Sequence, residues 1–117
     1  MEARAYLKYA RMTPRKVCIV LDLIRGKQVD EAMGILKNTR RGASEYLIKL
    51  LASATANAVN YAETHNIADF DKSNLYVSEC FVCPGPTLKR GQARGRGGFD
   101  RLLKRTSHMT IVVKTKE

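Results

Sequence analysis

The sequence predicts an α+β fold, in which a three-stranded antiparallel sheet packs with three helices and a long β-hairpin protrudes from the sheet. Two observations predict it. Apolar residues recur in the order strand, three helices, strand, strand, for which helices on one face of an antiparallel sheet are the simplest packing. A glycine-rich basic segment at about residues 84–108 also has too few apolar side chains to build a core. The 117 residues suffice for one domain with a modest core, so we expect residues 1–117 to form a single domain.

The first predicted strand covers residues 2–9, where apolar and polar side chains alternate with a period of two. The side expected to face the core consists of Ala3, Ala5, Leu7 and Tyr9. A helix follows, with Thr13 as its N-cap and Pro14 as its first residue, because proline lacks only an N–H that would be unpaired there. Apolar residues then recur at helical spacing, and Gly26 is expected to end the helix in a left-handed conformation.

Two more helices are predicted before the hairpin. The second begins with Asp30 as its cap and ends near Asn38. The third runs from about residue 41 to residue 65 and has a continuous stripe for the core, formed by Ala43, Leu47, Leu50, Leu51, Ala54, Ala58, Tyr61 and Ala62. Asn57 and Asn60 lie on or beside this stripe. They either bond to backbone or RNA or are ordinary surface amides.

The hairpin legs are expected to run from about residue 75 to residue 113. Each leg then has roughly 19 residues, which span about 60 Å in extended form, whereas the rest of the chain forms a body about 30 Å across. The hairpin must therefore extend beyond the body. A lone two-stranded ribbon is marginally stable in water, so a partner outside the chain is expected to hold it.

Charge indicates what this partner is. The chain has a formal net charge of +10, and residues 84–117 contain 9 basic and 2 acidic side chains. The hairpin cations stand against a single acid, Asp100, and are Lys89, Arg90, Arg94, Arg96, Arg101, Lys104 and Arg105. A polyanion is the expected partner, and arginines that grip phosphate and stack on bases favour RNA over DNA. No membrane partner is expected, because this glycine-broken segment lacks the broad apolar face of a membrane-binding helix.

Two smaller features leave alternatives open. Arg11, Arg15 and Lys16 cluster around the start of the first predicted helix, where they either hold an anion such as phosphate or form a solvated face. His108 either contacts a base or phosphate or is a merely exposed strand residue.

Enzymatic, metal and redox chemistry are not predicted. Cys80 and Cys83 form a C-x-x-C pair, but a tetrahedral zinc site needs four ligands and no second pair exists. A thioredoxin-type pair needs a helix N-terminus, whereas this one ends an apparent strand ahead of Pro84. No catalytic motif is recognisable, so we expect no cofactor, and the cysteines are interpreted as small apolar thiols in or near the sheet. A redox protein that uses both thiols is the alternative.

Five segments together resemble a known family. They are R-M-T-P-R-K-V from Arg11, V-L-D-L-I-R-G-K from Val20, S-A-T-A-N-A from Ser53, G-P-T-L-K-R from Gly85 and D-R-L-L-K-R-T-S-H from Asp100. In order and spacing they resemble the bacterial large-subunit ribosomal proteins of the L22 type, and the similarity spans essentially the whole chain.

The resemblance implies a cytoplasmic ribosomal protein with its body near the nascent-peptide exit and its hairpin threaded through ribosomal RNA. It implies early assembly into the large subunit, with large-subunit ribosomal RNA, neighbouring large-subunit proteins and the nascent peptide as partners; no homo-oligomer is expected. The residues implied to contact ribosomal RNA are Arg11, Arg15, Lys16, Lys89, Arg90, Arg94, Arg96, Arg101, Lys104, Arg105 and His108. Those implied to face the exit tunnel at the tip are Gly91, Gln92, Ala93 and Arg94.

The sequence departs from the family pattern at this tip. Family members commonly have bulky aliphatic residues and a proline where Gly91, Gln92 and Ala93 stand here, and Arg-Ala where Gly98 and Phe99 stand. Losing a proline and gaining glycines predicts a more flexible turn. An RNA chaperone that acts away from the ribosome is the alternative function.

Overall fold

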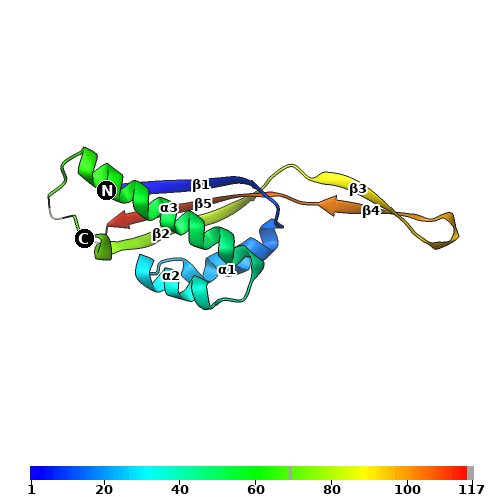
Figure 1. The fold of residues 1–117 in the computed structure, drawn as a ribbon, viewed down its shortest axis with the longest axis horizontal. Helices are drawn as coiled ribbons and strands as arrows, with labels where there is room; N and C mark the ends of the chain where they lie inside the picture. Colours follow the sequence, from blue (N-terminus) through cyan, green and yellow to red (C-terminus); the bar gives the residue numbers. More distant parts are fainter. Residues whose placement is uncertain (69, 116–117) are drawn as a thin grey trace.

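The computed structural model describes residues 1–68 and 70–115 and has the predicted α+β architecture (Figure 1). The three helices are α1 (Pro14–Ile24), α2 (Val29–Asn38) and α3 (Gly42–Thr64). The strands are β1 (Glu2–Ala10), β2 (Leu75–Pro84), β3 (Leu88–Ala93), β4 (Phe99–Lys104) and β5 (Ser107–Thr115). Two short 3-10 helices, Lys72–Asn74 and Gly95–Gly97, precede β2 and connect β3 to β4.

The main sheet is antiparallel with the order β1-β5-β2, so the last strand of the chain lies in its centre. All three helices cover the same face of this sheet (Figure 1). Residues paired across an antiparallel ladder share a face. The row Ala5, Ile111 and Cys80 therefore lies on the face that packs against the helices, and every second residue lies on the opposite, outer face.

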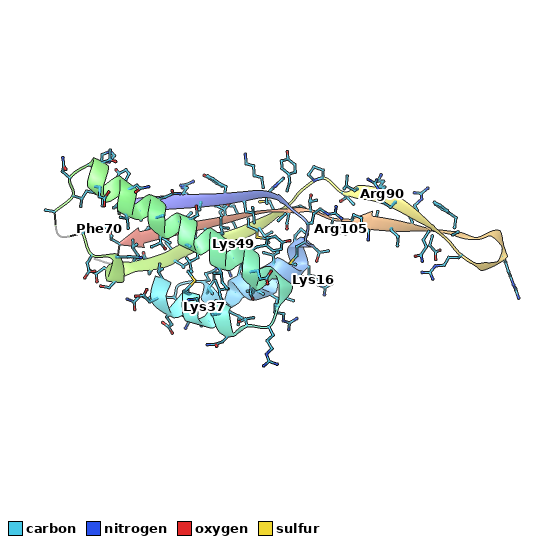
Figure 2. All side chains as sticks on the ribbon, in the orientation of Figure 1. Lys16, Lys37, Lys49, Phe70, Arg90 and Arg105 are labelled. Carbon is cyan, nitrogen blue, oxygen red and sulfur yellow. The ribbon has the colours of Figure 1, made fainter. Side chains whose placement is uncertain are left out.

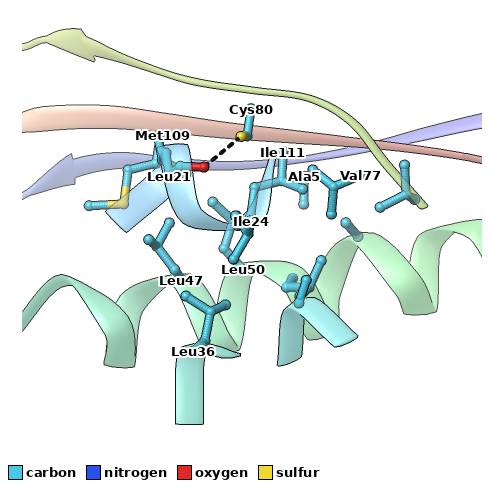
Figure 3. Close-up of a cluster of buried hydrophobic side chains, with 14 of the residues drawn as sticks. Ala5, Leu21, Ile24, Leu36, Leu47, Leu50, Val77, Cys80, Met109 and Ile111 are labelled. Atoms are coloured by element: carbon cyan, nitrogen blue, oxygen red, sulfur yellow. Dashed lines mark hydrogen bonds between the residues drawn. The ribbon is translucent and has the colours of Figure 1, made fainter. Parts of the chain in front are cut away.

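The core between the sheet and the helices is aliphatic (Figure 3). The stripe predicted for α3 supplies Leu47, Leu50 and Leu51, and α1 supplies Leu21 and Ile24 at the predicted spacing. Each of these side chains is almost completely buried, but the prediction of Tyr61 for the same stripe was wrong, because Tyr61 is 42% exposed. Burial of a leucine or isoleucine side chain contributes about 1.5–3 kcal/mol, so this layer stabilises the body.

The helix ends agree with the predictions in part. Thr13 occupies the N-cap position before Pro14, although its side chain accepts no capping hydrogen bond, and Gly26 has a left-handed φ of 78°. The prediction of Asp30 as the cap of α2 was wrong, because Gln28 is the N-cap. The helix begins earlier than the local sequence suggests, because Val29 is buried and Gln28 forms a backbone bridge with Tyr76.

The prediction that Tyr9 faces the core was also wrong. The register of β1 against β5 shifts between Leu7 and Ala10, and Tyr9 has a φ of 59° and is 64% exposed. A β-bulge of this kind inserts one residue, so the side chains beyond it change face. Ala10 is buried in place of Tyr9.

The Asn57 side chain forms a hydrogen bond to the backbone, which was one of the alternatives that the sequence left open. Its Nδ2 donates to the carbonyl oxygen of Arg4 at 2.7 Å. The bond joins α3 to the edge strand β1, whose carbonyl would otherwise face solvent.

Candidate nucleic-acid interface

The hairpin consists of two ladders joined by an irregular segment. The β2–β5 ladder ends at the pair of Pro84 and Ser107, and the β3–β4 ladder begins at the pair of Leu88 and Lys104. We call residues 88–104 the arm, and residues 85–87 with 105–107 the neck. The arm extends well beyond the helices, and the whole molecule measures 70 × 27 × 16 Å (Figure 1). The predicted overhang is confirmed.

Hydrogen bonds around the buried Thr106 hold the two strands of the neck together. The amide of Gly85 donates to the carbonyl oxygen of Thr106 at 2.9 Å, and the Thr106 hydroxyl donates to the carbonyl oxygen of Pro86 at 2.6 Å. A Cβ on Gly85 would lie 2.5 Å from the Thr106 hydroxyl oxygen, so only glycine fits without a rearrangement. These contacts determine the direction in which the arm leaves the sheet.

The neck is also bonded to the loop before α1. The Ser107 hydroxyl, which is fully buried, donates to the carbonyl oxygen of Met12 at 2.8 Å. This loop and the first turn of α1 carry the exposed side chains of Arg11, Arg15 and Lys16. Lys16 and Arg105 accordingly lie at the same end of the body (Figure 2). The structure thus places the basic cluster of α1 beside the start of the arm.

Cations project from both faces of the arm. In the β3–β4 register Arg90 pairs with Leu102 and Leu88 with Lys104, which places Arg90 and Lys104 on one face. On the other face Lys89 pairs with Leu103 and Gly91 with Arg101. These four cations are exposed. A flat anionic surface would meet only one pair of them, whereas a partner that surrounds the arm meets all four.

One hairpin cation has an acidic partner. Arg94 Nε lies 2.6 Å from Asp100 Oδ2, where it closes the end of the β3–β4 ladder. Such an exposed pair contributes at most about 1 kcal/mol. Among the residues that the structure describes, no ion pair involves the other six hairpin cations. Their charge is available to a partner.

The turn at the tip comes after the residues implied to face the tunnel. Gly91, Gln92 and Ala93 belong to β3, and the amide of Arg94 donates to the carbonyl oxygen of Gly98 across the turn at 2.9 Å. Arg96 stands at the apex with a left-handed φ of 60°. The apex therefore presents an exposed guanidinium, with the three β3 residues on its flank.

The two departures from the family pattern contact each other. A Cβ on Gly91 would lie only 1.9 Å from the ring of Phe99, which therefore rests on the bare backbone of Gly91. Phe99 itself is 69% exposed. A large residue at position 99 thus fills the space that a bulky residue at position 91 would occupy.

His108 is half-buried and joins the neck to β1. Its Nδ1 accepts a hydrogen bond from the amide of Tyr9 at 3.0 Å, so that nitrogen carries no proton in this arrangement. The Tyr9 ring lies edge-on to the imidazole, with centroids 4.8 Å apart. One ring nitrogen has a structural role, and contact of the other with RNA stays a prediction.

The cysteine pair is split across the sheet. Cys80 faces the core and its thiol donates to the carbonyl oxygen of Leu21 at 3.5 Å (Figure 3). Cys83 pairs with His108 and is exposed on the outer face. Burial raises the pKa of the Cys80 thiol, which disfavours the reactive thiolate. The interpretation of Cys80 as an apolar thiol in the sheet is confirmed. Within residues 1–68 and 70–115, no group of three or more His, Cys, Asp or Glu side chains could hold a metal ion.

The residues that build the neck were not predicted from the sequence. Gly85, Thr106 and Ser107 were part of quoted motifs but received no role. Their signal was the presence of small polar residues in a segment that alternates with buried Met109 and Ile111.

Among the described residues, 1–68 and 70–115, no helix has the length and apolarity needed to cross a membrane.

Comparisons with known proteins show which sequences this chain resembles. The sequence model of one family, described as "Ribosomal protein L22p/L17e", matches residues 5–114. A protein of Clostridium tetani named large ribosomal subunit protein uL22 is 53% identical over 117 residues, which is the full length of both chains. Proteins with the same name from Acetivibrio thermocellus and Halothermothrix orenii are 53% and 51% identical. They align with 98% and 100% of this chain, and with 87% and 98% of their own lengths.

Proposed function

Because the chain belongs to the ribosomal protein L22p/L17e family, we propose that its arm and neck bind large-subunit ribosomal RNA. Membership makes the chain a structural, non-enzymatic constituent of the large subunit of the cytoplasmic ribosome. The family also implies that its partners are ribosomal RNA and neighbouring ribosomal proteins. The proposal concerns which residues make the RNA contacts and what these contacts achieve.

The observation that carries the proposal is the distribution of cations over both faces of an arm with no buried side chain. Arg90 and Lys104 on one face, and Lys89 and Arg101 on the other, need anions on two sides. Folded RNA offers crevices lined by phosphates, into which an extended ribbon fits. Each phosphate contact releases counterions, which contributes binding free energy that falls as salt rises.

The neck extends this interface to the body. Arg11, Arg15 and Lys16 lie beside the arm because the Ser107 hydroxyl bonds the loop before α1. RNA bound along the arm can therefore continue onto the start of α1, where N–H groups and the helix dipole favour a phosphate. His108 and Arg105 stand between the two parts of the site.

The proposed assembly role follows from the lack of a core in the arm. An isolated two-stranded ribbon is marginally stable, so RNA that orders the arm couples docking of the protein to folding of the RNA. Such coupling is most useful early in assembly, before the crevice around the arm has closed.

The proposed tunnel role concerns the tip. An arm that reaches through the RNA brings its apex, with Arg96, to the far side, where it lines the exit tunnel beside the nascent peptide. Gly91, Gln92, Ala93 and Arg94 form the flank of this tip. The overhang of the arm supports this role.

Sedimentation of tagged chain in growing cells tests the RNA-binding proposal. The wild-type chain should remain with large subunits at equal stoichiometry through a high-salt wash. Replacement of Lys104 and Arg105 by glutamate should strongly reduce incorporation, because like charges then meet phosphates.

The matched control reverses two charges on the helical layer, away from the arm. Lys37 and Lys49 are exposed on α2 and α3 (Figure 2). The Lys37→Glu/Lys49→Glu variant has the same net charge as the arm variant and should be incorporated normally. Equal incorporation of both variants would contradict the role of the arm, and a wild-type chain that sediments free of subunits would indicate the off-ribosome chaperone.

A further inference from the structure

Most aromatic side chains of this protein lie outside its core. The buried hydrophobic residues are alanine, valine, leucine, isoleucine, methionine and cysteine, whereas all five tyrosines and three phenylalanines are exposed or half-buried. Four of these eight lie on the outer face of the main sheet: Tyr6, Tyr9, Tyr76 and Phe81. Aromatic side chains usually contribute their large area to a core or to an interface. Here Tyr46 and Phe70, both half-buried, pack against the core, whereas the four rings on the outer face do not.

The register places two of the rings symmetrically. Tyr6 and Phe81 both pair with Thr110 of the central strand, from β1 on one side and β2 on the other. The strands are about 4.8 Å apart, which separates the two residues by about 10 Å across the sheet. Tyr6 is 59% exposed and Phe81 is 44% exposed, while Thr110 between them is buried. Within the part of the chain that the structure describes, no helix covers this face, because all three lie on the opposite one (Figure 1).

The charges on the outer face favour an anion at the end near the neck. At the far end the Glu2 carboxylate forms ion pairs with Arg4 at 2.9 Å and with Lys114 at 3.9 Å. Glu79 stands in the row of Arg4, one row further from the neck than Tyr6. Lys8, next to Tyr9, is exposed and has no ion pair in the described part of the chain.

The same end of the face continues into the neck. His108 shares the outer face with Thr110, and its ring contacts Tyr9. Arg105, three residues before His108 in the neck, is exposed. The outer face of the main sheet and the basic arm are therefore parts of one continuous surface.

We propose that this outer face binds an unpaired stretch of RNA, with bases stacked on Tyr6 and Phe81 and a phosphate held by Lys8. The proposal rests on the proposed function, because it takes RNA as the partner that the adjoining arm already holds. An open sheet with exposed rings beside cations is suited to unpaired bases, which present flat faces for stacking. A purely apolar protein partner would leave Lys8 and the neck cations unmatched.

Chemical probing of large subunits from growing cells tests the proposal. Subunits that contain Tyr6→Ala/Phe81→Ala are treated with dimethyl sulfate, which modifies unpaired adenines and cytosines. Because the arm is unchanged, the variant should be incorporated. A small set of unpaired bases should become about 5-fold or more reactive, the factor that corresponds to the roughly 1 kcal/mol lower limit of one lost stacking contact.

A matched control removes an exposed ring elsewhere. Tyr61 on α3 is 42% exposed, close to the value for Phe81, and stacks on His65. Tyr61→Ala should leave the reactivity of these bases unchanged. The exchange Tyr6→Phe/Phe81→Tyr keeps both rings and should restore protection, which separates stacking from an effect on folding.

Three outcomes would overturn the proposal. One is unchanged reactivity in the Tyr6→Ala/Phe81→Ala subunits, and another is loss of protection in the ring-preserving exchange. The third comes from a photoreactive benzoylphenylalanine introduced at Tyr6, which should crosslink to ribosomal RNA. Crosslinks to a ribosomal protein instead would assign the face to a protein neighbour while leaving the arm's RNA role intact. Absence of the wild-type chain from large subunits would contradict the proposed function itself.

Discussion

The body and the arm are built by opposite rules from one chain. In the body the three helices and the main sheet enclose side chains such as Leu47 and Ile111 that are fully buried. In the arm every residue from 88 to 104 is exposed except Leu102, which is half-buried. The body has a hydrophobic core of its own, whereas the arm has only cross-strand hydrogen bonds and pairs of side chains.

This difference shows where stability and function are separated. Buried area stabilises the body without any partner. The arm gives up that source of stability, and in return it presents cations on both faces along its length.

The largest effect is expected for a core leucine. Leu47→Ala should lower the free energy of unfolding by about 2–5 kcal/mol, because Leu47 is fully buried between α3 and the sheet. The same substitution at Leu103 in the arm, which is 47% exposed, should change it by less than about 0.5 kcal/mol. Urea unfolding followed by circular dichroism measures both. Similar losses would show that the arm contributes to the core.

The neck should be intermediate. Gly85→Ala places a methyl group against the Thr106 hydroxyl and the His108 ring, so it should cost about 1–3 kcal/mol. The matched control is Gly34→Ala in α2, where nothing lies within 4 Å of the added methyl group. This change should stabilise the protein by about 0.5–1 kcal/mol. If both changes have the same sign, the neck is looser than the structure indicates.

At the tip the effect should be small and local. The arm of the free protein should be mobile, and Phe99→Ala should increase this mobility, because one cross-strand contact contributes about 0.2–1 kcal/mol. Heteronuclear ¹⁵N relaxation measures this, and urea unfolding of the body should not change. Adding Gly91→Ile to Phe99→Ala should restore order by filling the same space from the other strand. Residues 88–104 as rigid as the helices in the free protein would contradict the prediction.

The smallest effect is expected from the pH dependence of Cys80. Burial raises the pKa of its thiol in the folded protein, so the unfolded chain loses this proton first as pH rises above about 8.5. The contribution of the thiol to the stability of the folded protein is therefore complete below that pH and decreases above it. Urea unfolding measures the free energy of unfolding, which should fall less steeply between pH 7 and 10 in Cys80→Ala than in the wild type. The exposed Cys83→Ala is the control and should keep the wild-type slope.

Local sequence determined most of the elements and the chemistry of the arm. Helical spacing of apolar residues predicted the inward side chains of α1 and α3, because burial of one stripe depends only on the 3.6-residue period. The concentration of glycine and arginine predicted an exposed basic hairpin, since such a segment cannot form a core whatever surrounds it. The matched motifs then indicated the family.

Tertiary structure alone decided how these elements meet. The central place of β5, the bulge at Tyr9 and the early start of α2 at Val29 all depend on partners distant in sequence. The same holds for the neck, where Thr106 and Ser107 bond residues about 20 and 95 positions away. Periodicity reports which side of an element is apolar. It carries no information about which strand lies beside it or where an inserted residue shifts the register, because those are settled by the free energy of the whole packed sheet.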